Sequence, residues 1–279
     1  MSANRIDEGS TFGCPKVEPS SRTMLTNRQK RILSAVVKEY TETAVPIGSK
    51  HLAGKYGFNL SPATIRAEMN ELENKGYLFQ PHTSAGRIPT DKGYRYFVEE
   101  IMPDRELSRA EQKKLQAELL KLKAKNTRLA RTAAKLLASL SGNLAISGLK
   151  DEFYDFGMRE LLDEPEFQEI DDLCRLAETL DFIDERVDRL IKNLKDDEVK
   201  IFIGKENPIK EISNCSMVIS PYRTKSGEKG ILALIGPKRM KYAKNKSLIE
   251  YMKKLLGGAA VIAIIFTNYE SITNIRIHF

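Results

Sequence analysis

The segment from Met24 to Met102 places helix start and stop signals so close together that only short helices with tight turns fit it. Ser61 and Pro62 are the residue types favoured at the N-cap and first turn of a helix, and Gly76 is the type that favours its end. The three expected helices span Asn27 to Thr43, Ser49 to Tyr56 and Ser61 to Lys75. The sequence therefore predicts a compact three-helix unit.

A hairpin is expected after the third helix. Tyr77 to Gln80 has the composition of a strand, and His82 to Thr90 contains residues that reverse the chain. Thr90 then caps a fourth helix, Asp91 to Met102, which Pro103 ends. This order indicates a winged-helix domain over residues 24–102, a fold that places one helix in the major groove of DNA.

The third helix has one apolar face, made by Ile65, Met69 and Leu72. Its opposite face carries small and polar side chains: Ala63, Arg66, Ala67, Asn70 and Asn74. Arg66 and Asn70 have forked hydrogen-bonding ends that pair with guanine and adenine edges. The face suits a DNA groove, and the alternative is a solvated helix surface with no ligand.

Residues beside that face are expected to position the backbone of DNA. Ser61 and Thr64 lie at the positive end of the third helix, where a phosphate binds favourably. Arg87 in the wing suits a phosphate or a narrow minor groove, and the alternative is an ordinary hairpin turn. The full expected DNA-binding set is Ser49, Lys50, Ser61, Ala63, Thr64, Arg66, Asn70, His82, Thr83, Ser84, Gly86 and Arg87.

A heptad pattern follows the winged helix. Leucines recur every seventh residue from Leu115 to Leu136, and Asn126 falls on the alternate seam, where a buried Asn selects a parallel pair of helices. The expected dimerisation residues are Leu115, Leu119, Leu122, Asn126, Leu129 and Leu136. The alternative is one long helix packed against its own domain.

The remaining chain predicts an α+β protein with a second, mixed α/β module. Residues 103–150 are expected to form the connecting helix, and Asp151 to Asp197 is expected to be helical. Antiparallel strands are expected at Val199 to Ile203, Met217 to Ser220 and Gly230 to Ile235, before a last helix that ends near Leu256. Residues 1–23 are expected to be a disordered leader, and residues 257–279 form a tail without a clear prediction.

Charge and composition narrow the function classes. The net charge of +7 is segregated: residues 24–102 carry +3 and 107–141 carry +7, whereas 150–200 carry −10. Basic surface beside a DNA-reading fold attracts phosphate, and the acidic segment is expected to face away. The three cysteines, at 14, 174 and 215, lack metal-ligand or disulfide spacing, and the acidic run Asp163 to Asp172 lacks calcium-loop spacing.

These observations argue against an enzyme. The three histidines, at 51, 82 and 278, are far apart, and the sequence shows no nucleophile with a base, metal cluster or phosphate loop. The apolar run from Ala259 to Phe266 is too short to span a bilayer, so we expect a cytoplasmic protein without a cofactor.

Several blocks resemble the family of heat-inducible transcription repressors called HrcA. The blocks in the winged-helix segment are Leu25 to Gln29, Pro46 to Ser49, Ser61 to Met69, His82 to Thr90 and Gly93 to Tyr96. Further blocks are Pro165 to Phe167, Ile203 to Asn207, Asn214 to Ser216 and Ile235 to Tyr242. Together they cover nearly all of residues 24–102 and parts of the second module.

The resemblance implies a winged helix, a GAF-like module over residues 151–256 with regulatory and dimerising roles, and an inserted dimerising segment. It also implies a homodimer that binds the inverted repeat called CIRCE upstream of chaperone operons, with the GroEL/GroES chaperonin as a partner. Between Ser147 and Met158 this chain lacks roughly a hundred residues of the family pattern, including early strands of the module, so a truncated module is expected. The leucine seam is then a candidate replacement for the lost dimer surface.

Two other binding functions fit the same residues. A winged-helix protein that binds RNA, or DNA without sequence preference, would also use the basic segments. A chaperone-interacting scaffold would keep the fold without specific binding. A specific reader differs from both in its preference for one base sequence.

Overall fold

The computed structural model describes residues 25–123, 129–149, 152–167, 170–181, 194 and 198–257. The leader expected at 1–23 and the tail after Gly257 lie outside the described residues. The N-terminal elements are α1 (Asn27–Thr43), α2 (Ser49–Lys55), α3 (Pro62–Asn74), β1 (Leu78–Phe79), β2 (Ile88–Pro89), α4 (Asp91–Tyr96) and a π-helical turn, η1 (Phe97–Ile101). Their order confirms the winged helix expected from the sequence.

Local caps explain where these helices begin. The Gln29 backbone N–H donates to Thr26 Oγ1 at 3.2 Å, and the Thr26 N–H donates back to Gln29 Oε1 at 3.3 Å, which forms a capping box before α1. In the same way, the Gly93 N–H donates to Thr90 Oγ1 at 3.0 Å at the start of α4. Each cap satisfies donors that a helix N-terminus would leave unpaired.

The winged helix has its own apolar core. Its fully buried side chains come from every helix and from the hairpin, and include Ile32, Val36, Leu52, Ile65, Leu72 and Leu78. The hairpin is short: Leu78 pairs with Pro89, and Phe79 pairs with Ile88. Because β1 and β2 each have two residues, the packing of Leu78 and Pro89 on the helices supports the wing more than the two-residue ladder does.

The second module contains a five-stranded antiparallel sheet in the order β4-β3-β7-β6-β5. Its strands are β3 (Leu144–Leu149), β4 (Glu152–Phe156), β5 (Lys200–Ile203), β6 (Cys215–Arg223) and β7 (Lys229–Pro237). Its helices are α5 (Arg109–Lys123), α6 (Leu129–Ser141), α7 (Met158–Leu162), α8 (Ile170–Asp181) and α10 (Tyr242–Gly257). Short 3₁₀ turns are η2 (Pro165–Phe167), η3 (Gly204–Glu206) and η4 (Lys210–Ile212).

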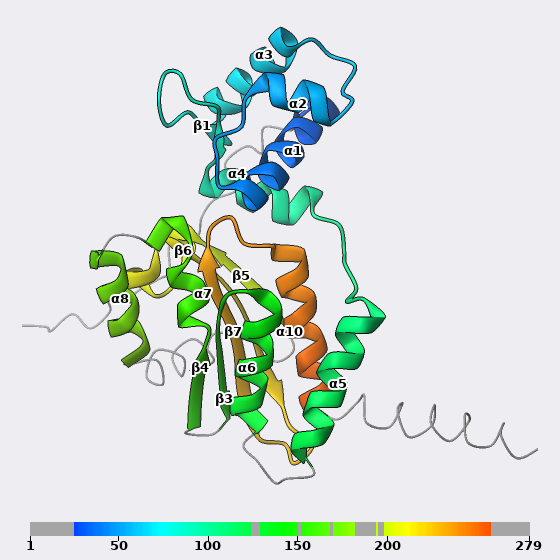
Figure 1. Cartoon of the computed structure of the whole chain (residues 1–279), viewed down its shortest axis with the longest axis vertical. Coiled ribbons are helices and arrows are strands. Elements are labelled where there is room, and N and C mark those ends of the chain that lie inside the picture. Colours follow the sequence, from blue (N-terminus) through cyan, green and yellow to red (C-terminus); the bar gives the residue numbers. More distant parts are fainter. Residues whose placement is uncertain are drawn as a thin grey trace, which may run out of the picture.

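Both faces of this sheet are covered, as Figure 1 shows. Ala145, Leu232 and Leu234 belong to one buried cluster with side chains of α6 and α10. Their neighbours along the strands, such as Ile146 and Ala233, belong to a second cluster with residues of α7, η2 and η4. Successive residues of a strand point to opposite faces, so β3 and β7 are apolar along nearly their whole length.

The expected leucine seam is not exposed in the structure. The segment forms two helices, α5 and α6, which pack on each other and on α10. Leu115, Leu119 and Leu136 are at most 8% exposed and lie in the chain's own core, and Leu129 packs against it. The prediction that these leucines pair two chains is therefore wrong for them, because the chain itself covers the apolar stripe. The side chains of Leu122 and Asn126 lie outside the described residues.

The hairpin of β3 and β4 corrects a second expectation. The sequence predicted a connecting helix up to residue 150 and a helical segment from Asp151 onward. Instead β3 pairs with β4 on one side and with β7 on the other. Gly157, in a left-handed conformation with φ of 97°, leads from β4 into α7. The long-range pairing with β7 decides the strand structure.

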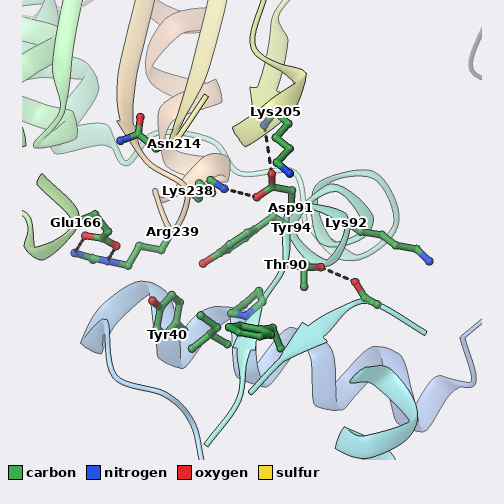
Figure 2. A pocket seen from close by; sticks show the side chains of 14 residues that line it. Tyr40, Thr90, Asp91, Lys92, Tyr94, Glu166, Lys205, Asn214, Lys238 and Arg239 are labelled. Carbon is green, nitrogen blue, oxygen red and sulfur yellow. Dashed lines mark hydrogen bonds and ion pairs between the residues drawn. The ribbon is translucent and has the colours of Figure 1, made fainter. Parts of the chain in front are cut away.

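The winged helix docks on one end of the sheet through charged and aromatic side chains. Lys238 Nζ lies 2.7 Å from Asp91 Oδ1, and the Lys205 backbone N–H donates to Asp91 Oδ2 at 3.3 Å. Figure 2 shows these contacts around a pocket of about 610 Å³ between the two domains, with Tyr40 and Tyr94 on its walls. None of the described helices is long and apolar enough to cross a membrane.

Candidate nucleic-acid interface

Helix α3 and the wing lie together at the end of the molecule farthest from the sheet (Figure 1). The inner face of α3 is buried, with Ile65 and Leu72 fully inaccessible. The outer face is exposed at Ala63, Arg66, Ala67, Asn70 and Asn74. This arrangement agrees with the division of faces expected from the sequence.

Hydrogen bonds from the middle of α3 and from the residue after its last turn hold it against α1. Arg28 Nη1 and Gln29 Nε2 donate to the two oxygens of Glu68 at 3.1 and 3.2 Å. Lys75 Nζ donates to Gln29 Oε1 at 3.0 Å, just beyond the last turn of α3. Because these contacts join residues about 40 positions apart, they orient the outer face of α3 relative to the domain.

The N-terminus of α3 is capped by its own hydroxyl groups. The Thr64 N–H donates to Ser61 Oγ at 3.1 Å, and the two side-chain oxygens lie 2.9 Å apart. Ser61 therefore starts the helix as predicted. It remains exposed, so its predicted phosphate contact stays a prediction.

The wing has an exposed polar tip on a fixed root. His82, Thr83 and Ser84 are exposed at the tip. Gln80 Nε2 donates to the carbonyl oxygens of Thr83 and Ala85 at 3.0 and 2.9 Å, and so closes the turn. Sequence reasoning did not single out Gln80, although a glutamine amide has two donors suited to bridging carbonyl groups.

At the root of the wing the backbone of Arg87 pairs with Ile47, in the connection between α1 and α2. The Arg87 N–H donates to Ile47 O at 2.9 Å, and the Ile47 N–H donates to Arg87 O at 3.0 Å. A Cβ atom at Gly86 would overlap the Ile47 backbone. Gly86 thus has a packing role, because only glycine permits this approach.

The side chain of Arg87 turns toward α3 and contacts two residues there. Its Nε donates to Glu73 Oε2 at 2.8 Å, and its Nη2 donates to Asn70 Oδ1. The Arg87 side chain is only 12% exposed. Two residues predicted to contact DNA separately, Asn70 and Arg87, are therefore joined, and Glu73, which sequence reasoning missed, completes the group.

Helix α2 exposes one of the two residues expected to contact DNA. Lys50 is exposed, whereas Ser49 is buried, with 7% of the whole residue exposed, so Ser49 does not belong to the candidate interface.

The carboxylate of Glu39, on α1, receives hydrogen bonds from Lys55, Tyr56 and His51, all shorter than 2.9 Å. These bonds lower the pKa of Glu39 to about 2. This cluster fixes α2 to α1.

The outer face of α3 and the wing together present donors and small side chains rather than reactive groups. Within the described part of the chain, Arg66 is exposed and has no ion-pair partner. The described residues contain no group of three or more His, Cys, Asp or Glu side chains that would hold a metal ion. The face is chemically suited to bind the edges and phosphates of nucleic acid.

Two family models match this chain. The model described as the HrcA protein C-terminal domain matches residues 93–245, which is more than half of the chain. The model described as the LexA DNA-binding domain matches residues 22–86, the segment that contains α1, α2, α3 and most of the wing.

Curated relatives of this chain are named as HrcA repressors. A heat-inducible transcription repressor HrcA of Thermodesulfovibrio yellowstonii is 27% identical over 342 aligned positions, which cover 84% of this chain and 97% of the relative. Because 84% of 279 residues is about 234, about 108 of those positions have no residue here, which agrees in size with the expected shortening. The HrcA repressor of Synechococcus elongatus is 50% identical over 123 residues, or 44% of this chain and 35% of the relative.

One solved structure shares the fold. A crystal structure described as that of a hypothetical protein aligns with a TM-score of 0.64 and 20% sequence identity, and covers 84% of this chain and 98% of its own. At this identity the likeness extends to the fold alone.

Proposed function

This chain belongs to the HrcA family, and on that premise we propose that it is a heat-inducible transcription repressor that binds an inverted-repeat operator as a homodimer. The observation that carries the proposal is the exposed outer face of α3, with Arg66 and Asn70 beside the polar wing tip. Small residues on this face, Ala63 and Ala67, allow close approach to base edges.

The homodimer and the chaperonin belong to the proposal as well. A two-fold dimer matches an operator that is an inverted repeat, because each subunit reads one half-site. The family resemblance supports GroEL/GroES as the partner that keeps the repressor competent. We expect purified chaperonin to raise the fraction of chain that binds DNA after heating, and bovine serum albumin to leave that fraction unchanged.

The central experiment selects DNA and then measures preference. The full chain is used to enrich duplexes from a random library, and the enriched sequence is called the selected duplex. Affinities for the selected duplex and for a scrambled duplex are then measured by fluorescence anisotropy at several salt concentrations. We expect an inverted repeat, and a complex of two chains per duplex by analytical ultracentrifugation.

Variants test which side chain reads the bases. We expect Arg66→Ala to reduce the preference for the selected duplex by about 1–3 kcal/mol, because a guanidinium reads guanine with two hydrogen bonds. Arg31→Ala is the matched control: it removes the same charge from α1 beside Glu100 and Ile101, away from α3. The control variant should keep the preference.

Two results would favour the other binding functions. Equal affinity for selected, scrambled and RNA duplexes would indicate a non-specific binder. Absence of DNA binding together with retained chaperonin binding would indicate a scaffold. Either result would contradict the proposal that the chain is a sequence-specific repressor.

A further inference from the structure

Asn70 on α3 and Arg87 at the root of the wing come from different elements and hydrogen-bond to each other. Arg87 Nη2 donates to Asn70 Oδ1, and Arg87 Nε donates to Glu73 Oε2 at 2.8 Å. Of these three residues, Asn70 belongs to the exposed outer face of α3. The Arg87 guanidinium thus connects the wing to the outer face of α3.

The pairing changes what Arg87 itself can do. Its charge is balanced by Glu73, and its side chain is 12% exposed. An arginine in this state attracts a phosphate less than an exposed, unpaired one such as Arg66 does, because the neighbouring carboxylate opposes the phosphate charge. A role as phosphate anchor therefore fits the structure poorly.

The pairing also determines which end of the Asn70 amide is available. The oxygen is engaged toward the wing, so the free end is the Nδ2–H₂ group, which only donates. A donor pairs with acceptors in the major groove, which are guanine O6, thymine O4 and the N7 atom that both purines present. Reading adenine with two bonds would require the amide oxygen to accept from the adenine amino group as well.

We propose that Arg87 is a positioning residue that sets the amide orientation of Asn70, so that Asn70 reads an acceptor edge of a purine. The inference rests on the proposed function. Its second support is the fixed root of the wing, where the two backbone bonds to Ile47 hold Arg87 before any DNA is bound. A side chain held in advance loses less conformational entropy when the complex forms.

The first test uses the full chain, the selected duplex and a double-mutant cycle. We expect Arg87→Ala to lower the preference for the selected over the scrambled duplex about tenfold, and the Arg87→Ala, Asn70→Ala protein to be no worse than Asn70→Ala alone. The slope of log affinity against log salt should stay that of the wild type. A slope that falls by about 1 with an unchanged preference would make Arg87 a phosphate anchor and overturn the inference.

A conservative variant separates charge from positioning. Arg87→Lys keeps the positive charge but lacks the fork that reaches Asn70 and Glu73 together. We expect it to lose preference as Arg87→Ala does, with a circular-dichroism melting curve showing that both variants are folded. Full rescue by lysine would contradict the positioning role.

Modified bases test the donor orientation. At one purine of the selected duplex, replacing N7 by carbon should weaken wild-type binding about tenfold and leave the Asn70→Ala protein unaffected. The proposed orientation of the Asn70 amide is wrong if no purine shows this pattern. It is also wrong if removing the amino group of an adenine at that position weakens wild-type binding equally. These failures differ from failure of the proposed function, in which the wild type selects no sequence at all.

Discussion

Glu39 shows how one buried carboxylate organises a helix pair. It is nearly inaccessible and receives hydrogen bonds from Lys55, Tyr56 and His51, so α2 is tied to α1 by charge as well as by apolar packing. These bonds favour the ionised form, which is why its pKa falls to about 2.

We expect Glu39→Gln to lower the free energy of unfolding by about 1–2 kcal/mol at pH 7. The pKa shift alone corresponds to roughly 3 kcal/mol, but solvent screens Lys55 and His51, which are at least half exposed. The contribution is fully present above pH 4.5 and is lost as the pH falls to about 2, because the folded state binds the proton less readily. Urea unfolding of the wild type and the variant between pH 7 and pH 2.5 measures this contribution. The control is Glu71→Gln, at an exposed glutamate. A difference in free energy of unfolding between wild type and Glu39→Gln that does not depend on pH would refute this account.

Two buried tyrosines at the domain boundary differ in their hydroxyl partners. Tyr242 OH lies 2.8 Å from Ser216 Oγ and also donates to Lys238 O. Tyr94 is 2% exposed, its hydroxyl has no partner among the described residues, and Figure 2 shows it directed toward the space between Tyr40 and Arg239. Burial raises the pKa of Tyr94 well above the usual range.

We therefore expect loss of the hydroxyl to change the free energy of unfolding differently at Tyr94 and at Tyr242. Tyr94→Phe should leave the free energy of unfolding unchanged or raise it by up to about 1 kcal/mol, because it removes an unpaired buried polar group. Tyr242→Phe should cost about 1–2 kcal/mol, because it leaves Ser216 without its partner. Guanidinium unfolding of both variants compares them, and equal losses would mean that Tyr94 has a partner in solution.

At the scale of elements, the wing is held by its root. β1 and β2 pair over two residues each, too few to support a hairpin alone. The backbone bonds between Arg87 and Ile47 and the close approach of Gly86 to Ile47 attach the wing to the connection between α1 and α2. The wing is therefore attached to the helical part of the domain at its root.

Gly86→Ala should displace the wing. The new methyl group would overlap the Ile47 backbone, so we expect a loss of more than about 1 kcal/mol in stability and weaker DNA binding. Gly54→Ala is the matched control, because its Cβ meets nothing within 4 Å and alanine favours a helix by up to about 1 kcal/mol. Thermal unfolding measures the stability of both variants, and fluorescence anisotropy measures their DNA binding. Unchanged stability and DNA binding of Gly86→Ala would show that the root of the wing can adapt to the extra methyl group.

At the scale of the whole molecule, Arg239 joins the two domains. Its Nε donates to Glu166 Oε1 at 2.6 Å, its Nη2 contacts Glu164, and its Nη1 donates to the Thr41 carbonyl oxygen of α1 at 3.2 Å. The side chain is 10% exposed. Glu164 and Glu166, which belong to the acidic segment expected to face away from DNA, thus pair with a buried arginine at the domain boundary.

We expect Arg239→Ala to lower stability by about 3 kcal/mol and to separate the unfolding of the two domains. It leaves Glu164 and Glu166 without their partner and breaks the contact with α1. The matched control at the same boundary is Lys241→Ala, whose ion pair with Glu42 is at least half exposed on the glutamate side and should contribute under about 1 kcal/mol. Calorimetry distinguishes one transition from two, and a single unchanged transition for Arg239→Ala would refute the coupling.

Elements whose signals are local could be predicted from the amino-acid sequence alone. Ser61 and Thr90 cap the helices they were expected to cap, and the strands β5, β6 and β7 lie where β-rich runs predicted them. Caps and periodic apolar faces act between residues a few positions apart, so they can be seen in the chain without its fold.

Tertiary structure decided which partner each surface meets. An apolar stripe such as Leu115 to Leu136 shows that something covers it, but only the packing of α5 and α6 on α10 shows that the same chain does. In the same way, the sequence predicted that Asn70 and Arg87 each contact DNA, but it could not show that the two side chains, 17 residues apart, hydrogen-bond to each other. Contacts between distant segments depend on the orientation of whole elements, and no local pattern carries that information.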